Sequence, residues 1–525
     1  MARPAPPVPA VDRGPTGSPV GWNIALAGGL AVLATVALLR AINKPLWFDE
    51  IFTLILARME SPAEIIEALR VPIDALPPPY YMICRATLLL VPDEHVGIRL
   101  PSVCGFLVAI ACTYAFLAVR VDRISALTAA AFVACTALAD YAFEARPYAL
   151  MTGSLCAAAC CWQRVDRSWV WAVALACGLA LAVSCHPYAI FAWPAFALAE
   201  VIVLASEHRV RPRVWLALAI GIVPFIACWP LLANFRAAFG QHWWSAPGLA
   251  MVLLAPQVLF KWSGGMWGPA VTAALVAVCI AWIVRATWPS RRPASVWFPA
   301  SPLTPAECGL VIGLLAIPVV AVVAVRLAHG GLTDRYMMPS IIGAALAIGA
   351  LTSTAPPAFR ALALAIMLVD YGITARPAFA AWAKGELLES RSTIRESLQD
   401  RAAGLGDATS PIVMANGFQY MQAIHYCDRD AMTRTWAIAD PAAAIDLSPG
   451  RSDVIDRSLL SVRPYVPVQV SGYEDFLARH ESFLLSAAGD TTEWLLPRLL
   501  RDGHAVALVS PSRSGSLYRV TVKRP

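Results

Sequence analysis

Long apolar segments recur along most of this chain, and they constrain its fold more than any other feature of the sequence. A helix needs about 20 consecutive, mostly apolar residues to cross the hydrocarbon core of a membrane. We expect about eleven such spans. They are predicted at 23–43, 98–119, 124–143, 147–163, 168–185, 187–206, 214–233, 267–284, 309–325, 337–353 and 358–374. Two shorter apolar segments, 77–91 and 248–261, are predicted to lie on the membrane surface or to re-enter it.

The composition agrees with a protein that is embedded largely in lipid. Hydrophobic residues make up 58% of the chain and charged residues 14%, whereas soluble domains carry about 25% charged residues. Most of the 13 cysteines fall within predicted spans, where they act as small apolar packing residues. No CxxC pair with zinc spacing appears in the sequence. The sequence therefore predicts an all-α polytopic membrane protein.

The basic residues predict which side of the membrane each loop occupies. The tail and the loops on its side hold about thirteen Lys and Arg, against about five in the short loops opposite, and cytoplasmic loops carry this excess. Residues 1–22 are Pro-rich and lack the layout of a cleaved signal, so we expect a disordered cytoplasmic tail. An odd number of spans then places the C-terminal region outside. The net charge of +6 follows from this topology and does not indicate a nucleic-acid partner.

The apolar pattern stops near Thr374, which divides the chain into three expected parts. These are the tail 1–22, a membrane domain 23–374 whose first outside loop is 44–97, and a small soluble extracytoplasmic α/β domain 375–525. In the first loop, 61–70 is predicted to be a surface helix that begins with a capping box of Ser61 and Glu64. In the C-terminal region we expect strands at 411–416, 504–511 and 516–523, and helices at 385–404, 473–489 and 491–503.

Charged residues gather at the predicted outer ends of the spans. Ionisable groups at this depth are costly unless they are paired or functional. Two interpretations are open: the residues are interfacial charges or salt bridges that hold loops together, or they converge on one water-filled cavity. The carboxylates are Asp49, Glu50, Asp74, Asp140 and Glu144, and the cations are Arg99, Arg146, Lys261 and Arg335.

Five short motifs in this set resemble one family. They are WFDE (47–50), DALPPPYY (74–81), RLPS (99–102), EARPY (144–148) and RY (335–336). In their order and predicted side, they closely resemble the GT-C superfamily of polyprenyl-phosphate-sugar-dependent glycosyltransferases. The likeness is greatest to aminoarabinose transferases of lipid A and rhizobial galacturonic acid transferases, and more distant to protein O-mannosyltransferases. It covers roughly residues 25–340, and the C-terminal region contributes little.

The resemblance implies roles for the charged residues. The first-loop acid of the family is the catalytic base, which maps onto Asp49, and Glu50 either orients Asp49 or acts beside it. Transfer of a sugar from a lipid phosphate to a hydroxyl needs a base for the proton and cations for the departing phosphate. Arg146 is the first candidate for phosphate binding, because a guanidinium matches phosphate oxygens. The alternative is a salt bridge from Arg146 to Glu144 or Asp140.

The remaining candidates have less specific roles. Arg335 and Lys261 are second choices for the phosphate, and Arg99 is expected to anchor the loop. Asp74 is predicted to face the same cavity, beside the acceptor or a divalent metal, although no firm ligand set is evident. A lone histidine is more often a packed residue than a ligand, and this holds for His186. The residues assigned to the acceptor or to a metal are Asp74, Asp140, Glu144, His186 and Tyr336.

Together these features predict an inverting glycosyltransferase at the outer face of the cytoplasmic (inner) membrane. Its partners would be the bilayer, a polyprenyl-phosphate monosaccharide and an envelope acceptor, which is lipid A or its core, a wall glycan or a protein. The alternatives are a flippase or exporter of lipid-linked sugars, and a polymerase or ligase. A transporter places charges near the bilayer midplane, where Asp370 is the main acid predicted inside a span. The sugar, the acceptor, metal dependence and oligomeric state are not predicted.

Overall fold

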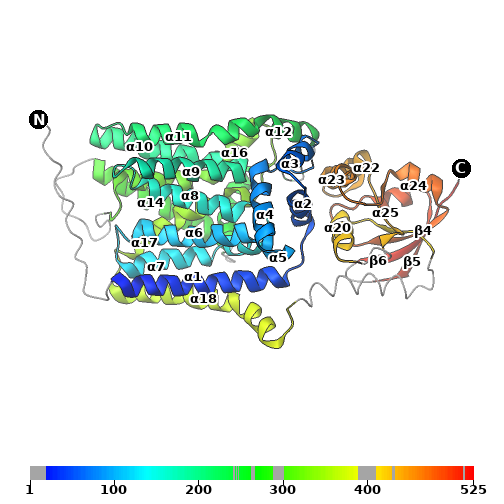
Figure 1. Ribbon diagram of the computed structural model, residues 1–525, viewed down its shortest axis with the longest axis horizontal. Helices are drawn as coiled ribbons and strands as arrows, with labels where there is room; N and C mark the ends of the chain where they lie inside the picture. The colour runs from blue at the N-terminus through cyan, green and yellow to red at the C-terminus, as the bar shows by residue number, and fades with distance from the viewer. Residues whose placement is uncertain are drawn as a thin grey trace, which may run out of the picture.

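A helical bundle and a smaller α/β unit lie end to end along the longest axis of the molecule (Figure 1). The computed structural model describes residues 19–71, 73–239, 243, 245, 247–261, 267–287, 301–387, 409–427, 432–511 and 515–524. The α/β unit lies at the same end of the bundle as α2, α3, α4 and α5 from the predicted first outside loop (Figure 1).

Apolar helices that run along the long axis form the bundle (Figure 1). Their bounds are α1 Pro19–Asn43, α6 Leu100–Leu117, α7 Arg123–Ala134, α8 Tyr148–Trp162, α9 Trp169–Cys185, α10 Trp193–Glu207, α11 Pro212–Gly221, α12 Val223–Phe239, α14 Trp267–Thr287, α15 Pro305–Leu315, α16 Ile317–Leu327, α17 Ser340–Thr352 and α18 Pro357–Lys384. Some of these helices begin at a side chain that caps the first turn. For example, Thr304 Oγ1 accepts from Glu307 N at 3.2 Å, and the Glu307 carboxylate accepts from Thr304 N at 2.8 Å.

The structure does not confirm the predicted count of eleven membrane spans, because fewer of the described helices are both long and apolar enough to cross a membrane. Five helical segments of the described chain meet these criteria, and seven do if two bent pairs each count as one span. The bent pairs are Arg123–Ala134 with Ala137–Phe143, at 59°, and Pro305–Leu315 with Ile317–Leu327, at 50°. Other apolar helices, such as α8 and α9, are shorter. Each of the eleven predicted segments is helical, but the count of eleven spans is not confirmed.

Short helices cover the end of the bundle that faces the α/β unit. The predicted surface helix is α3 (Pro62–Arg70), where Ser61 Oγ accepts from Glu64 N at 3.3 Å, so the predicted cap is confirmed. The two shorter apolar segments form α4 (Pro78–Leu90) and α13 (Leu249–Leu259). The other short elements are α2 Phe48–Ala57, α5 Glu94–Gly97, η1 Ala137–Ala139, η2 Tyr141–Phe143, η3 Pro187–Ala192 and η4 Asp334–Met337.

The C-terminal unit is a mixed six-stranded sheet with helices packed on it. The strand order is β3-β2-β1-β4-β6-β5, with parallel pairing from β3 to β4 and antiparallel pairing of β6 with both β4 and β5. The strands are β1 Ile412–Met414, β2 Thr435–Ile438, β3 Val470–Ser471, β4 Ser482–Ala487, β5 Ala505–Ser510 and β6 Ser516–Thr521. The helices are α20 Gly417–Tyr426, α22 Pro441–Leu447, α23 Val454–Val462, α24 Tyr473–Arg479 and α25 Leu495–Arg501.

One predicted element of this unit is wrong. The segment 473–489, predicted as a single helix, is helix α24 followed by the central strand β4. Phe483, Leu484 and Leu485 are fully buried because β4 is paired on both edges. A short apolar run of this kind has no alternation that would distinguish a strand from a helix. Strands β2 and β3 are not predicted from the sequence, and the predicted helix at 385–404 lies almost entirely outside the described residues.

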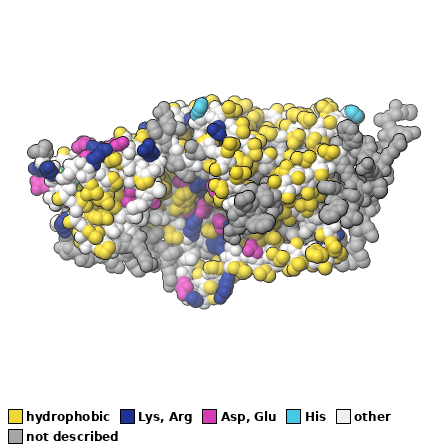
Figure 2. Space-filling view, turned by 180° about the vertical axis from the view of Figure 1, so that it is seen from behind, with side chains coloured by type: hydrophobic (Ala, Val, Ile, Leu, Met, Phe, Trp, Pro, Cys, Tyr) yellow, Lys and Arg dark blue, Asp and Glu magenta, His cyan; other side chains and the backbone are white. Residues whose placement is uncertain are grey.

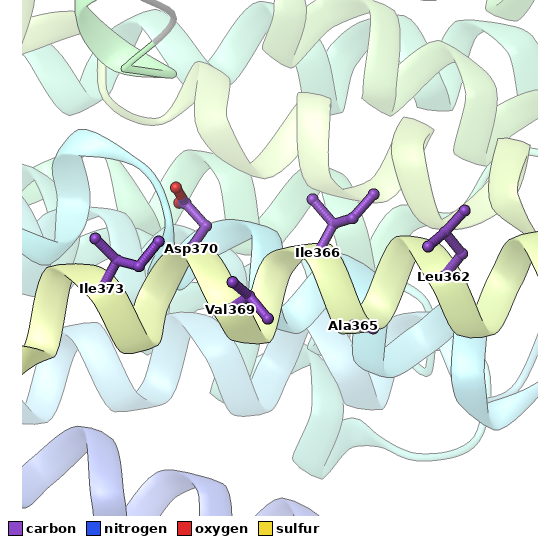
Figure 3. A pocket seen from close by; sticks show the side chains of 6 residues that line it. All are labelled: Leu362, Ala365, Ile366, Val369, Asp370 and Ile373. Carbon is purple, nitrogen blue, oxygen red and sulfur yellow. The ribbon is translucent and has the colours of Figure 1, made fainter.

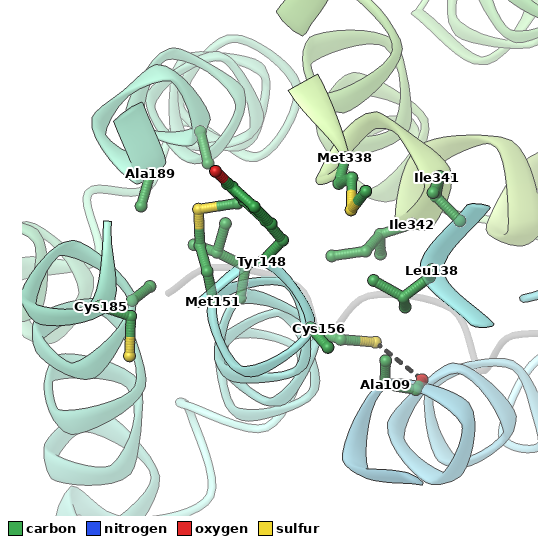
Figure 4. Packing of buried hydrophobic residues seen from close by; sticks show 14 of the residues in the cluster. Ala109, Leu138, Tyr148, Met151, Cys156, Cys185, Ala189, Met338, Ile341 and Ile342 are labelled. Atoms are coloured by element: carbon green, nitrogen blue, oxygen red, sulfur yellow. Dashed lines mark hydrogen bonds between the residues drawn. The ribbon is translucent and has the colours of Figure 1, made fainter. Parts of the chain in front are cut away.

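The bundle core is packed closely enough to bring helix backbones into contact. Figure 4 shows part of it, where Cys156 of α8 donates to the Ala109 carbonyl oxygen of α6 at 3.3 Å, beside Leu138 and Ile342. A Cβ added to Gly153 of α8 would lie 2.2 Å from the carbonyl oxygen of Gly105. These two helices therefore depend on glycine at their crossing.

An open groove runs along the outer face of α18. Its volume is about 410 Å³, and its lining is aliphatic apart from the carboxylate of Asp370 (Figure 3). The lining residues are Leu362, Ala365, Ile366, Val369, Asp370 and Ile373. The predicted intramembrane acid thus lies in a groove on a helix that is mostly exposed at the outside of the bundle.

The glycine contact generates a stability prediction. We expect Gly153→Ala to lower the thermal unfolding temperature of the detergent-solubilised protein, because overpacking costs about 1–3 kcal/mol and the opposing atoms are backbone. Gly28→Ala in α1 is the control, since no atom lies within 4 Å of the added methyl group. Equal unfolding temperatures for the two variants would contradict the close approach of α6 and α8.

Candidate active site

The two adjacent carboxylates of the first loop point in different directions. Asp49 and Glu50 lie in the first turn of α2, where consecutive residues are about 100° apart around the helix axis. The Glu50 side chain is completely buried, whereas 23% of the Asp49 side chain is exposed. Asp49 is therefore the member of the pair that faces accessible space, and the helix N-terminus favours its negative charge.

Glu50 forms a buried ion pair with Arg99. The Arg99 Nε and Nη2 atoms donate to the two carboxylate oxygens at 2.7 and 2.6 Å, and Ala145 N donates to Oε1 at 2.6 Å. Burial by itself raises the pKa of Glu50, but the charge and hydrogen bonds of Arg99, together with the charge of Lys44 and the N–H of Ala145, outweigh burial and lower it. Glu50 is thus a charged anchor inside the protein, and no part of it is open to a substrate.

Arg99 also holds the segment that leads into α2. Its Nη1 donates to the carbonyl oxygens of Ala41 at 2.6 Å and Lys44 at 2.8 Å, and its Nη2 donates to that of Pro45 at 3.2 Å. These carbonyls lie in the last turn of α1 or directly after it, where helical backbone acceptors lack intrahelical partners. One guanidinium therefore fixes the turn between α1 and α2, as expected for an anchor of the loop.

Two arginines from distant segments flank the carboxylate of Asp49. Arg146 Nη2 lies 3.6 Å from Asp49 Oδ2, and Arg335 Nη2 lies 3.8 Å from the same oxygen. Arg146 Nη1 also pairs with Asp74 Oδ2 at 3.1 Å. Among the ion pairs of the described residues, Arg146 does not pair with Glu144 or Asp140, which was the alternative that the sequence left open. Asp49, Asp74, Arg146 and Arg335 form what we call the Asp49 cluster, whose formal charges cancel.

Aromatic side chains surround the arginine side of the Asp49 cluster. The Arg335 guanidinium lies 5.6 Å from the ring centre of Tyr148, and 5.9 Å from those of Trp47 and Tyr336. His186 packs 4.6 Å from Tyr336, and its Nδ1 accepts from Tyr188 N at 3.2 Å. His186 is thus the packed, hydrogen-bonded residue that its sequence context favours.

Some of the predicted site residues lie outside this cluster. Lys261 Nζ and the Asp140 carboxylate pair with each other at 2.9 Å, and no ion pair of the described residues joins either to the Asp49 cluster. Glu144 pairs with Lys44, and burial raises the pKa of Glu144. These two pairs are the loop-holding salt bridges that the sequence leaves as an alternative.

Sequence reasoning missed some polar groups beside the Asp49 cluster. The Nε of Arg146, the Nε1 of Trp47 and the hydroxyl of Tyr148 are buried with no hydrogen-bond partner among the described residues. Buried polar atoms in folded proteins are nearly always paired, so these groups are available to a ligand. Trp47 and Tyr148 both belong to motifs noted above, WFDE and EARPY, and their position beside charged residues is the signal that could have identified them.

The residues of the cluster do not fit a resident divalent metal. Both carboxylates face guanidinium groups, which occupy the positions that a cation would take. In the described parts of the chain, the single grouping of three His, Cys, Asp or Glu ligand atoms lies elsewhere. The cluster is instead suited to holding an anion beside a base.

The C-terminal unit contacts the loop that carries Asp49. Helix α20 contributes Gln422, whose Nε2 donates to the Leu46 carbonyl oxygen at 3.0 Å, and Tyr426, whose hydroxyl accepts from Leu46 N at 2.6 Å. Phe418 packs edge-on against Phe48 at 5.1 Å. Figure 2 shows charged side chains in the hollow between the apolar bundle and the C-terminal unit.

Comparisons with known proteins identify the fold. No family model and no curated protein matches the chain. The structure of ArnT from Cupriavidus metallidurans in the apo state matches with a TM-score of 0.57 and 13% identity, over 95% of this chain and 98% of that chain. ArnT bound to undecaprenyl phosphate matches with a TM-score of 0.51 and 13% identity, over 96% and 98%. An Archaeoglobus fulgidus oligosaccharyltransferase in complex with Zn and sulfate scores 0.44 at 13% identity, over 93% and 72%.

The structural likeness to ArnT extends over nearly the whole chain. ArnT, an aminoarabinose transferase, is a GT-C superfamily member. The resemblance that the five motifs indicate is therefore confirmed for the fold, and the likeness includes the C-terminal region, where the sequence motifs contribute little.

The buried ion pair leads to a stability prediction. We expect Glu50→Gln to destabilise the protein by about 3–5 kcal/mol, because it leaves the Arg99 charge buried without its counter-ion. The measurement is the thermal unfolding temperature in detergent, with Glu67→Gln as control, since Glu67 forms an exposed pair with Arg70 worth about 0–1 kcal/mol. If Glu50→Gln unfolds at the same temperature as the control, the pair does not anchor the loop.

Proposed function

We propose that this chain is an inverting glycosyltransferase that moves a monosaccharide from a polyprenyl phosphate to an acceptor hydroxyl of the cell envelope. The observation that supports it is the position of the Asp49 carboxylate between Arg146 and Arg335, with 23% of its side chain exposed. A base and two phosphate-binding cations at one point are what this transfer requires. The fold of ArnT, solved with undecaprenyl phosphate, agrees with such a donor.

The proposed reaction is a single displacement at the anomeric carbon. The acceptor oxygen forms a bond to that carbon while the bond from the carbon to the phosphate oxygen breaks, and the electron pair leaves with the polyprenyl phosphate. Asp49 takes the proton from the acceptor hydroxyl. Arg146 and Arg335 bind the phosphate oxygens as negative charge develops on them. Attack opposite the leaving group inverts the anomeric configuration.

Neighbouring residues act by positioning these groups. Asp74 holds one Nη atom of Arg146 at 3.1 Å, so the unpartnered Nε of Arg146 is free to point at the donor. Glu50 acts through Arg99 and the loop and does not touch the substrate. The hydroxyl of Tyr148 and the indole N–H of Trp47 are further hydrogen-bonding groups for the donor or for the incoming acceptor.

The cluster lies at the end of the bundle that meets the C-terminal unit, which we assign to the outer face of the inner membrane. A lipid-linked donor suits this location because its chain remains in the bilayer while its head reaches the cluster. The acceptor is lipid A or its core, a wall glycan or a protein. Against a flippase or exporter, Asp370, the acid within a long apolar helix, is exposed and lines an open groove on α18.

The test is sugar transfer by the purified protein in lipid nanodiscs supplied with labelled polyprenyl-phosphate sugars and envelope acceptors. We expect Asp49→Asn to lower the rate of transfer by at least about 100-fold, the usual contribution of a general base, while donor binding is kept. Arg146→Lys should weaken donor binding, because the fork that matches phosphate is lost.

Glu60→Gln is the matched control, because Glu60 is an exposed acid of the same loop. Its rate of transfer should equal that of the wild type. Undiminished transfer by Asp49→Asn would remove Asp49 as the base. Movement of the lipid-linked sugar across the bilayer without any transfer would favour the exporter instead.

A further inference from the structure

Three side chains of metal-binding type meet where the bundle and the C-terminal unit join. Glu94 and His95 begin helix α5, and His425 lies near the end of α20, more than three hundred residues later in the chain. Their ligand atoms all lie within 4.8 Å of one another. In the described parts of the chain, these three residues form the one such group that the structure brings together. We call them the Glu94 triad.

The distances within the Glu94 triad are close to those of ligands that share one ion. His425 Nε2 lies 2.9 Å and His95 Nδ1 lies 3.9 Å from the same carboxylate oxygen, Oε1 of Glu94. In a tetrahedral zinc site, with bonds of about 2.0–2.1 Å, neighbouring ligand atoms are roughly 3.3 Å apart. The two measured separations fall on either side of this value, and all three ligand atoms lie within 4.8 Å of one another, so the spacing is close to that of a zinc site.

The surrounding hydrogen bonds orient the ligands for this role. The Tyr426 hydroxyl lies 2.7 Å from His95 Nε2 and accepts from Leu46 N at 2.6 Å. A hydrogen bond at Nε2 directs the other ring nitrogen of His95, Nδ1, toward the metal, as second-shell partners of zinc-bound histidines do. Arg58 pairs with the second carboxylate oxygen of Glu94, Oε2, whereas Oε1 faces the two histidines and is hydrogen-bonded to His425 Nε2.

The donor set and its burial favour zinc over a hard cation. Two imidazoles and one carboxylate are a common three-ligand set for Zn²⁺, whereas Mg²⁺ and Ca²⁺ are bound mainly by oxygen. The side chain of His95 is 4% exposed and that of His425 12% exposed, while Glu94, at 25%, borders solvent. An ion therefore has access from the Glu94 side, where water supplies the fourth ligand.

We propose that Glu94, His95 and His425 bind Zn²⁺ and that this ion fastens the C-terminal unit to the bundle. The ion joins α20 to α5 one residue from Tyr426, whose hydroxyl holds the backbone of Leu46 just before the WFDE motif. The site is separate from the Asp49 cluster and takes no part in sugar transfer. Its role is to keep α20 against the loop that carries Asp49.

The direct test is metal binding by full-length, tag-free protein in nanodiscs after treatment with a chelator. We expect one Zn²⁺ per chain by elemental analysis and titration calorimetry. Glu94→Gln and His425→Gln should weaken zinc binding by at least about 100-fold, since even outer-shell changes cost about 10–100-fold. Tyr426→Phe keeps all three ligands and should weaken binding within that smaller range.

His480→Gln is the control, because His480 also belongs to the C-terminal unit but lies outside the Glu94 triad. It should bind zinc as the wild type does. Hydrogen exchange of α20, with and without zinc, separates loss of the site from misfolding: zinc should slow exchange in the wild type and not in His425→Gln. The proposal is wrong if the wild type takes up no more zinc than His425→Gln, or if zinc leaves the exchange of α20 unchanged.

Discussion

The ion pair between Glu50 and Arg99 is the contact on which the arrangement of this protein's outer end depends. Both side chains are fully buried, so each charge would be strongly destabilising without the other. Together with the carbonyls of Ala41, Lys44 and Pro45 and the N–H of Ala145, they satisfy one another almost completely. One buried network therefore joins the end of α1, the start of α2, the start of α6 and the loop that precedes α8.

This network determines where the reactive groups lie. Asp49 and Glu50 are neighbours in α2 and lie about 100° apart around the helix axis. When Glu50 is held inward, Asp49 therefore points outward. The same network holds Ala145, the residue before Arg146, and Thr53 Oγ1 adds a bond at 3.2 Å to the Ala145 carbonyl oxygen. The carboxylate and the guanidinium of the Asp49 cluster are thus placed by neighbours that are themselves structural. The C-terminal unit completes the arrangement through Tyr426 and Gln422, which bind the backbone of the residue before Trp47.

The sequence predicts those elements of the fold that depend on local features, such as long apolar segments and helix caps. It does not predict elements whose burial depends on pairing with distant parts of the chain. Each apolar segment is helical, and Ser61 caps α3, because length, apolarity and capping are local properties. Strand β4 was mistaken for part of a helix because its burial comes from β1 and β6, which are distant in the chain. The count of eleven spans is not confirmed because several of the described apolar helices are short or bent, as at residues 134–137.

The sequence by itself determined that this chain is a polytopic membrane protein and that Asp49, Arg146 and Arg335 are candidates for a common site, since apolar length and the motifs need no coordinates. Only the tertiary structure decided which charges are structural. It separated Glu50 from Asp49, paired Lys261 with Asp140, and brought His425 to Glu94 and His95. The physical reason is that burial and the choice of ion-pair partner depend on segments far apart in sequence, and no local pattern of residues records which of them will meet.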